Sequence, residues 1–111
     1  MAKYLFEARY TTTGSQGVIR EGGSSRRSVV ANMARELGGK LESFYFAFGE
    51  VDAYVIVELP DDITAAAVAL TVNQAAGASV RTVKLLAPEE LDQAVKKSVH
   101  YNAPGHRSYV P

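Results

Sequence analysis

Residues 44–59 constrain the fold of this chain more than any other segment. They form two runs of apolar, aromatic and β-branched residues, 44–48 and 53–59, separated by Gly49-Glu50-Val51-Asp52. This arrangement predicts a β-hairpin. A strand with one solvated face alternates apolar and polar residues, whereas these runs are nearly continuously apolar, so we expect both faces to be covered. Helices can cover one face in a chain this short, and a second copy of the protein is the simplest cover for the other.

Composition narrows the class of protein. The 111 residues suffice for one domain, and 47% hydrophobic with 22% charged residues is typical of a globular chain. Twelve basic residues balance twelve acidic ones, which argues against nucleic acid or an acidic membrane surface as a partner. Because the chain has no cysteine, disulfides and thiolate chemistry are excluded. Neither a signal peptide nor a membrane span is expected, and the predicted location is cytoplasmic.

Local patterns predict the order of the elements. Strands are expected at 3–10, 40–48, 53–59 and 79–86, and helices at 16–20, from Ser24 or Ser25 to 37, at 63–76 and from 88 to about 98. We therefore divide the chain into a single domain, 1–98, and a C-terminal tail, 99–111.

This order indicates an α+β fold of the ferredoxin-like βαββαβ type with an extra C-terminal helix. Such a fold has an antiparallel four-stranded sheet with both helices on one face. The other face is left bare, and we expect two such faces to pack together into a dimeric α+β barrel, as a homodimer or a higher multiple.

Four segments carry a family resemblance: residues 3–10, 20–27, 37–46 and 48–52. Together they resemble the GYD-domain family of small bacterial proteins, whose fold is similar to the dimeric α+β barrel and whose biochemical role is unassigned. Gly49 and Asp52 match the family signature, whereas Val51 stands where the family usually has tyrosine. The resemblance implies the fold and the dimer but no reaction.

Arg26 and Arg27 are the best candidates for an anion site, because they follow the glycines and serines of Gly22-Gly23-Ser24-Ser25 at a predicted helix start. The same residues are also explained by a serine-capped helix with solvated arginines, which we prefer. Aromatic residues on strands usually belong to a core, but a buried tyrosine hydroxyl needs a partner, so Tyr10, Tyr45 and Tyr54 are candidates for a ligand pocket.

Asp52 and the two histidines have plain alternatives to a functional role. Glycine and aspartate are turn residues, so Asp52 is expected first to fix the hairpin and only second to touch a ligand. His100 and His106 lack the spacing of a zinc pair and suit a surface or partner-docking tail. An acid or base role for His100 is a weaker alternative, and haem ligation by it weaker still. We expect no metal and no cofactor.

No catalytic motif arranges the polar residues of this chain. The first hypothesis is a homodimer that binds a small organic molecule between sheet and helices, with Arg26, Arg27, Tyr45 and Tyr54 as ligand-binding candidates. The alternative is a cofactor-independent enzyme, of monooxygenase or isomerase type, acting on a small aromatic or polyketide-like substrate. Its catalytic candidates are His100, Asp52, Tyr10 and Arg9.

Overall fold

A computed structural model describes residues 1–105 of the chain. Its elements follow in the order β1 (Ala2–Tyr10), α1 (Thr12–Glu21), α2 (Gly23–Glu36), β2 (Lys40–Phe46), β3 (Ala53–Leu59), α3 (Asp62–Gln74), β4 (Ala78–Leu85) and α4 (Pro88–Ala94). His106 lies outside the described residues.

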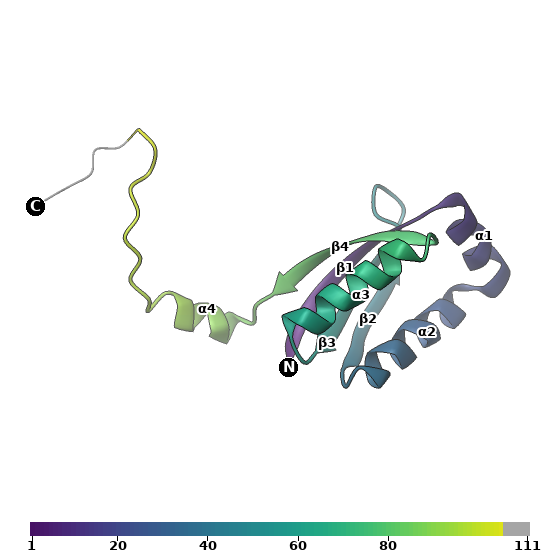
Figure 1. The fold of residues 1–111 in the computed structure, drawn as a ribbon, viewed down its shortest axis with the longest axis horizontal. Helices are drawn as coiled ribbons and strands as arrows, with labels where there is room; N and C mark the ends of the chain where they lie inside the picture. Colours follow the sequence, from purple (N-terminus) through teal and green to yellow (C-terminus); the bar gives the residue numbers. More distant parts are fainter. Residues whose placement is uncertain (106–111) are drawn as a thin grey trace, which may run out of the picture.

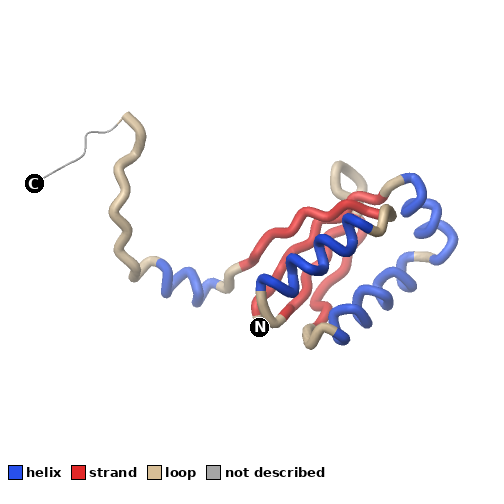
Figure 2. Tube along the Cα trace, viewed as in Figure 1, coloured by secondary structure: helices blue, strands red, loops and turns tan. Residues whose placement is uncertain are grey.

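The four strands form one antiparallel sheet in the order β2-β3-β1-β4. Helices α2 and α3 lie side by side on one face of this sheet, and α1 joins the end of β1 to α2 (Figure 1). Figure 2 shows the same two layers, with the strands in red behind the helices in blue. The prediction of an α+β ferredoxin-like fold with an added C-terminal helix is confirmed, whereas the dimeric barrel stays a prediction.

The core lies between the sheet and the helices, because alternate residues of the central strands point there. Tyr4, Phe6 and Ala8 of β1 are buried. They pair in register with Val57, Val55 and Ala53 of β3, which are buried as well. Small residues of the helices complete the contact, and the buried ones are Ala34, Ala65 and Val68. The apolar face formed by alternate residues of these strands is therefore covered by helices that carry short side chains.

No element within residues 1–105 covers the opposite face of the sheet. Leu5 occupies its centre and pairs with Ile56 on one side and Val83 on the other. Tyr54 and Tyr45 pair with each other toward the β2 edge and are 41% and 71% exposed. The hairpin strands therefore do bring apolar side chains to both faces, but helices cover only one of them.

Two helix starts differ from the sequence-based expectation. Helix α1 begins at Thr12 rather than near residue 16, because the Thr11 hydroxyl caps it by accepting a hydrogen bond from the Gly14 amide. Neither Ser24 nor Ser25 caps α2. Gly22, with φ of 87°, occupies the N-cap position without a side-chain bond, so the predicted serine cap is wrong.

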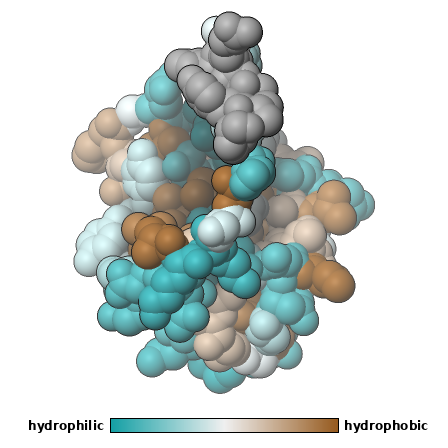
Figure 3. Space-filling view, turned by 90° about the vertical axis from the view of Figure 1, so that its left-hand side faces the viewer, coloured by the Kyte–Doolittle hydropathy of each residue, from teal (hydrophilic) through white to brown (hydrophobic). Residues whose placement is uncertain are grey.

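The last helix extends away from the rest of the molecule (Figure 1). Every residue from 86 to 102 is exposed. We call residues 86–102 the arm. Seen from the end that carries the arm, apolar groups stand out at several places among polar ones (Figure 3). No helix within residues 1–105 combines the length and apolar character needed to cross a bilayer.

Candidate functional site

A pocket opens where α1 meets the ends of β1, α3 and β4. Its outer lobe has a volume of about 250 Å³. Gly14, Gly17, Val18 and Glu21 of α1 form one wall. These positions are spaced i, i+3, i+4 and i+7, so they share one face of the helix. The wall is open because two of its four positions carry no side chain.

An inner lobe of about 80 Å³ continues between the sheet and helices α2 and α3. Its lining is aliphatic and aromatic apart from Tyr10 and Arg26, and includes Val30, Met33, Phe44, Val57 and Val68. Tyr10, Arg26, Val72 and Ala78 line both lobes. The two lobes therefore adjoin, and Tyr10 and Arg26 are the polar side chains at their junction.

Tyr10 and Arg26 interact directly at this junction. Burial raises the pKa of the Tyr10 phenol above its ordinary value, and the charge of Arg26 and its hydrogen bond to the phenol offset part of that shift. The phenol is consequently protonated at neutral pH. The pair presents a neutral hydroxyl and a cationic guanidinium to the otherwise apolar inner lobe and to the outer lobe, which Glu21 also lines.

Hydrogen bonds hold the outer lobe in shape. The Thr11 amide donates to the Gly77 carbonyl at 3.1 Å, and the Thr11 hydroxyl donates to the Ala76 carbonyl at 3.0 Å. The first turn of α1 thereby lies against the turn between α3 and β4. Gly14 allows this contact, because a Cβ there would stand 1.8 Å from the Gly77 carbonyl oxygen.

Asp52 and Arg9 support the loop between β2 and β3. The Asp52 carboxylate accepts a hydrogen bond from the Tyr10 amide at 2.9 Å, and its own amide donates to the Ala8 carbonyl at 2.9 Å. The Arg9 guanidinium donates to the Glu50 carbonyl at 2.7 Å. In this arrangement Asp52 ties the loop to the end of β1, next to the pocket, which agrees with its interpretation as a turn residue.

The remaining candidates lie apart from the pocket. Tyr45 and Tyr54 project from the open face of the sheet. Arg27 lines a separate shallow depression with Gly23, Phe44 and Phe46. His100 belongs to the arm, and the arm extends away from the sheet (Figure 1). Of the eight residues singled out from the sequence, the structure brings Tyr10 and Arg26 together in the pocket, and Asp52 lies beside them through its bond to the Tyr10 amide.

Sequence reasoning missed the glycine-rich wall of the pocket. Gly14, Gly17 and Gly77 have no side chain and carry no chemical signal of their own. The available signal was the spacing of small residues along one face of α1. It could be recognised only if that helix was predicted to start at residue 12 instead of 16.

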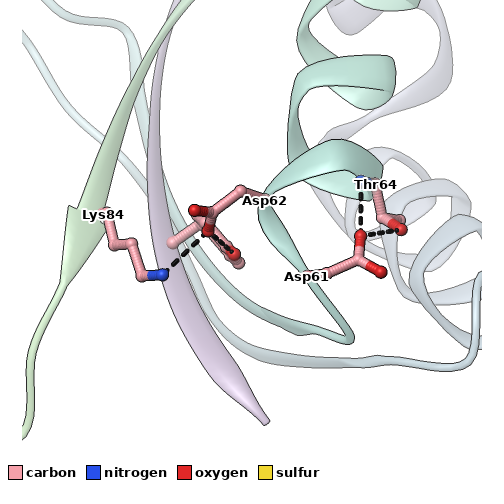
Figure 4. Close-up of polar contacts among 5 residues, drawn as sticks. Asp61, Asp62, Thr64 and Lys84 are labelled. Carbon is pink, nitrogen blue, oxygen red and sulfur yellow. Dashed lines mark hydrogen bonds and ion pairs between the residues drawn. The ribbon is translucent and has the colours of Figure 1, made fainter.

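A second polar cluster lies at the opposite end of the sheet and has a structural explanation. Lys84 of β4 and the Tyr4 hydroxyl both donate to the Asp62 carboxylate at the start of α3, the lysine at 2.8 Å. Next to it, Asp61 caps α3 by accepting from the Thr64 amide and hydroxyl (Figure 4). The cluster joins the first turn of α3 to the sheet.

No group of three or more His, Asp or Glu side chains within the described part of the chain could hold a metal ion. The candidate functional site is therefore the two-lobed pocket, which Arg26 lines with its guanidinium.

A comparison with family models places residues 4–95 in a GYD domain. No curated protein and no solved structure matches the chain significantly. The match covers most of the chain, from within β1 to the end of α4, and so spans the sheet and the helices that cover it. The chain therefore belongs to the GYD domain family.

Proposed function

We propose that this protein is a homodimer that binds a small organic molecule between the sheet and helices α1–α3. The observation that carries the proposal is the junction of the two lobes at Tyr10 and Arg26. Ligand pockets are typically apolar clefts with a few polar groups that fix orientation. This pocket has that composition, and its small volume suits a compact ligand.

Two uncovered apolar surfaces support the homodimer. One is the open face of the sheet around Leu5, Ile56 and Val83. The other is the arm, where Leu91 and Val95 are 56% and 73% exposed and stand one helical turn apart. A helix of seven residues is marginal in water without packing. In the proposed dimer the open faces pack together, and each arm contacts the partner.

The enzyme alternative has less support from the same geometry. An acid–base enzyme needs a group whose pKa lies near the working pH. Tyr10 is the catalytic candidate that lines the pocket, and burial raises its pKa, which makes it a poor base at neutral pH. A protonated phenol suits hydrogen bonding to a ligand, so binding is the function we favour.

Native mass spectrometry of the full chain, from gentle to denaturing conditions, tests both parts of the proposal. We expect a dimer that releases a small molecule of defined mass as conditions become harsher. A monomer under gentle conditions would contradict the homodimer.

A blocking variant tests the location of the ligand. In Gly17→Leu, a side chain grows from the pocket wall, where a Cβ meets nothing closer than the Arg20 guanidinium at 3.9 Å. We expect this variant to fold and to lose the retained mass. Gln16→Leu is the matched control, because residue 16 is exposed on the same helix and does not line the pocket. Equal retention in the two variants would place the ligand elsewhere.

A further inference from the structure

Arg26 is the starting point, because it is a half-buried cation without an acidic partner. Within residues 1–105 the side chain of Arg26 interacts with the neutral Tyr10 phenol. The two ion pairs in this part of the chain are Lys3–Glu42 and Lys84–Asp62, and neither involves Arg26. A charged group removed from water is costly unless an opposite charge or good hydrogen bonds compensate it. A ligand that brings a negative charge to this point would supply that compensation.

The guanidinium also has the geometry for an anion. Its planar set of donors matches the two oxygens of a carboxylate, which it can bind through parallel hydrogen bonds. The adjacent Tyr10 hydroxyl can donate a further bond to the same oxygens, since it is protonated at neutral pH. Charge-assisted bonds of this kind are stronger than bonds between neutral groups.

The inner lobe determines the rest of the ligand. Beyond Arg26 and Tyr10 its wall offers no other polar side chain, and Val30, Met33 and Val68 approach it from the helices while Phe44 and Val57 approach from the sheet. Because burial of apolar surface is favourable and burial of an unpaired polar group is not, the part of the ligand that enters this lobe is apolar. The volume of about 80 Å³ limits it to a short chain or part of a small ring.

Glu21 limits the charge of the ligand. It lines the outer lobe together with Tyr10 and Arg26. A dianion such as a phosphate ester would place a second negative charge in the lobe that contains this carboxylate, and like charges at close range repel. A single carboxylate bound at Arg26 avoids this repulsion.

We propose that the pocket binds a small organic monoanion, a carboxylate with a compact apolar body of the short-chain alkyl or aryl class. The carboxylate is held by the Arg26 guanidinium and the Tyr10 hydroxyl, and the apolar body extends into the inner lobe. This assignment rests on the proposed function, because it names the chemical class of that ligand.

Isothermal titration of the full-length protein with hexanoate and benzoate tests the assignment, with hexan-1-ol, benzyl alcohol and inorganic phosphate as comparisons. We expect the carboxylates to bind and the alcohols to bind at least about tenfold more weakly, as the loss of a charge-assisted hydrogen bond implies. Phosphate should also bind more weakly than the carboxylates, because it has no apolar body and brings a second negative charge to the lobe that Glu21 lines. Arg26→Gln should weaken carboxylate binding by a similar factor. Arg27→Gln is the matched control and should leave it unchanged, because Arg27 is the next residue but lines neither lobe.

The outcomes separate this inference from the function on which it rests. If the alcohols bind as tightly as the acids and Arg26→Gln has no effect, the carboxylate class is wrong while a ligand pocket is retained. If neither acid binds at millimolar concentration, the assignment is overturned, and the mass retained in native spectra still tests whether the pocket has a ligand. If Gly17→Leu does not reduce carboxylate binding, the site is elsewhere and both proposals fail.

Discussion

Two residues on the helix-covered face of the sheet, Val57 and Leu59, are 1% and 0% exposed. On the open face, Tyr54 of the same strand is 41% exposed. The two faces are formed by the same strands and share their backbone hydrogen bonds. They differ in the side chains that each face presents to the layer that packs on it. The covered face meets small helix residues and is complete within one chain, whereas the open face mixes an apolar centre with charged pairs at its border.

The border of the open face explains why a single chain tolerates it. Lys3 and Glu42 form an ion pair there, and Glu7 stands opposite Arg81 in register. Surfaces with an apolar centre and a polar rim are typical of protein interfaces that form after folding. The comparison therefore supports the proposal that one face serves folding and the other association.

The largest expected effect comes from placing a carboxylate on each face in turn. Val57→Asp buries an unpaired charge in the core, which costs about 3–5 kcal/mol, a large part of the stability of a small domain. Ile56→Asp alters the adjacent position on the open face, and we expect a folded chain that no longer dimerises. Circular dichroism during urea unfolding reports the first effect, and light scattering after size-exclusion chromatography reports the second. Equal loss of folding in both variants would mean that the open face also belongs to the folding core.

A second prediction concerns the close approach of α1 to the covered layer. Gly14→Ala forces the helix away from the Gly77 carbonyl, since its Cβ would stand 1.8 Å from that oxygen, and overpacking of this kind costs about 1–3 kcal/mol. Gly17→Ala in the same helix meets open space and should gain up to about 1 kcal/mol from helix propensity. Urea unfolding of the two variants measures whether each change raises or lowers the free energy of unfolding. A stabilised Gly14→Ala would show that this end of α1 is free to move off the sheet.

The third prediction compares the ion pairs of the two sides. Hydrogen bonds from Lys84 and then from Tyr4 lower the pKa of Asp62 below its ordinary value. A carboxylate with a lower pKa in the folded state stabilises the fold above its unfolded pKa, and this contribution is lost as the pH falls toward the folded pKa, here below about pH 4. Lys84 and Tyr4 keep their protons throughout this range.

Asp62→Asn should therefore lower stability at neutral pH and weaken its fall in acid. Glu42→Gln, which removes the carboxylate of the Lys3 pair on the open face, should change the acid profile less, because Glu42 accepts from one lysine, whereas Asp62 accepts from both Lys84 and the Tyr4 hydroxyl. Thermal melts of both variants between neutral and acidic pH measure the difference. A larger change for Glu42→Gln would indicate that the single ion pair on the open face contributes more to folding than the two bonds to Asp62.

The fold followed from the sequence because its signals are local and agree with one another. Apolar alternation located the strands, and Gly38-Gly39 and the turn at Pro60 separated the elements in the expected order. The starts of α1 and α2 did not follow, because the residues at their N-cap positions were not identified. No cap was predicted at Thr11, whose hydroxyl caps α1, and Gly22 holds the N-cap position predicted for serine.

The candidate site was harder to predict, because its residues meet through tertiary structure. Arg26 was singled out for its neighbours at a helix start, and Tyr10 for its hydroxyl, but nothing in the sequence joins positions in β1 and α2. Tyr45 and Tyr54 were grouped with them as aromatic residues, and the register of β2 and β3 places both on the other face of the sheet. Successive residues of a strand point to opposite faces of the sheet, so an error of one position moves a side chain to the other face. The bulge between Leu41 and Ser43 shifts this alternation within β2.

The smallest expected effect lies at the end of α3, where the covered layer turns back into the sheet. Ala76 has φ of 67°, a left-handed conformation that costs an L-residue about 1 kcal/mol relative to glycine. Ala76→Gly should relieve this strain and raise the free energy of unfolding by about 0.5–1 kcal/mol, less the greater entropy of glycine in the unfolded chain. Ala75→Gly is the matched control, because Ala75 has ordinary helical angles, with φ of −76°, and glycine there should destabilise. Both residues adjoin the pocket wall. Changes of opposite sign in the free energy of unfolding, measured in urea, would show that backbone strain is retained at the turn that shapes the pocket. A destabilised Ala76→Gly would contradict this.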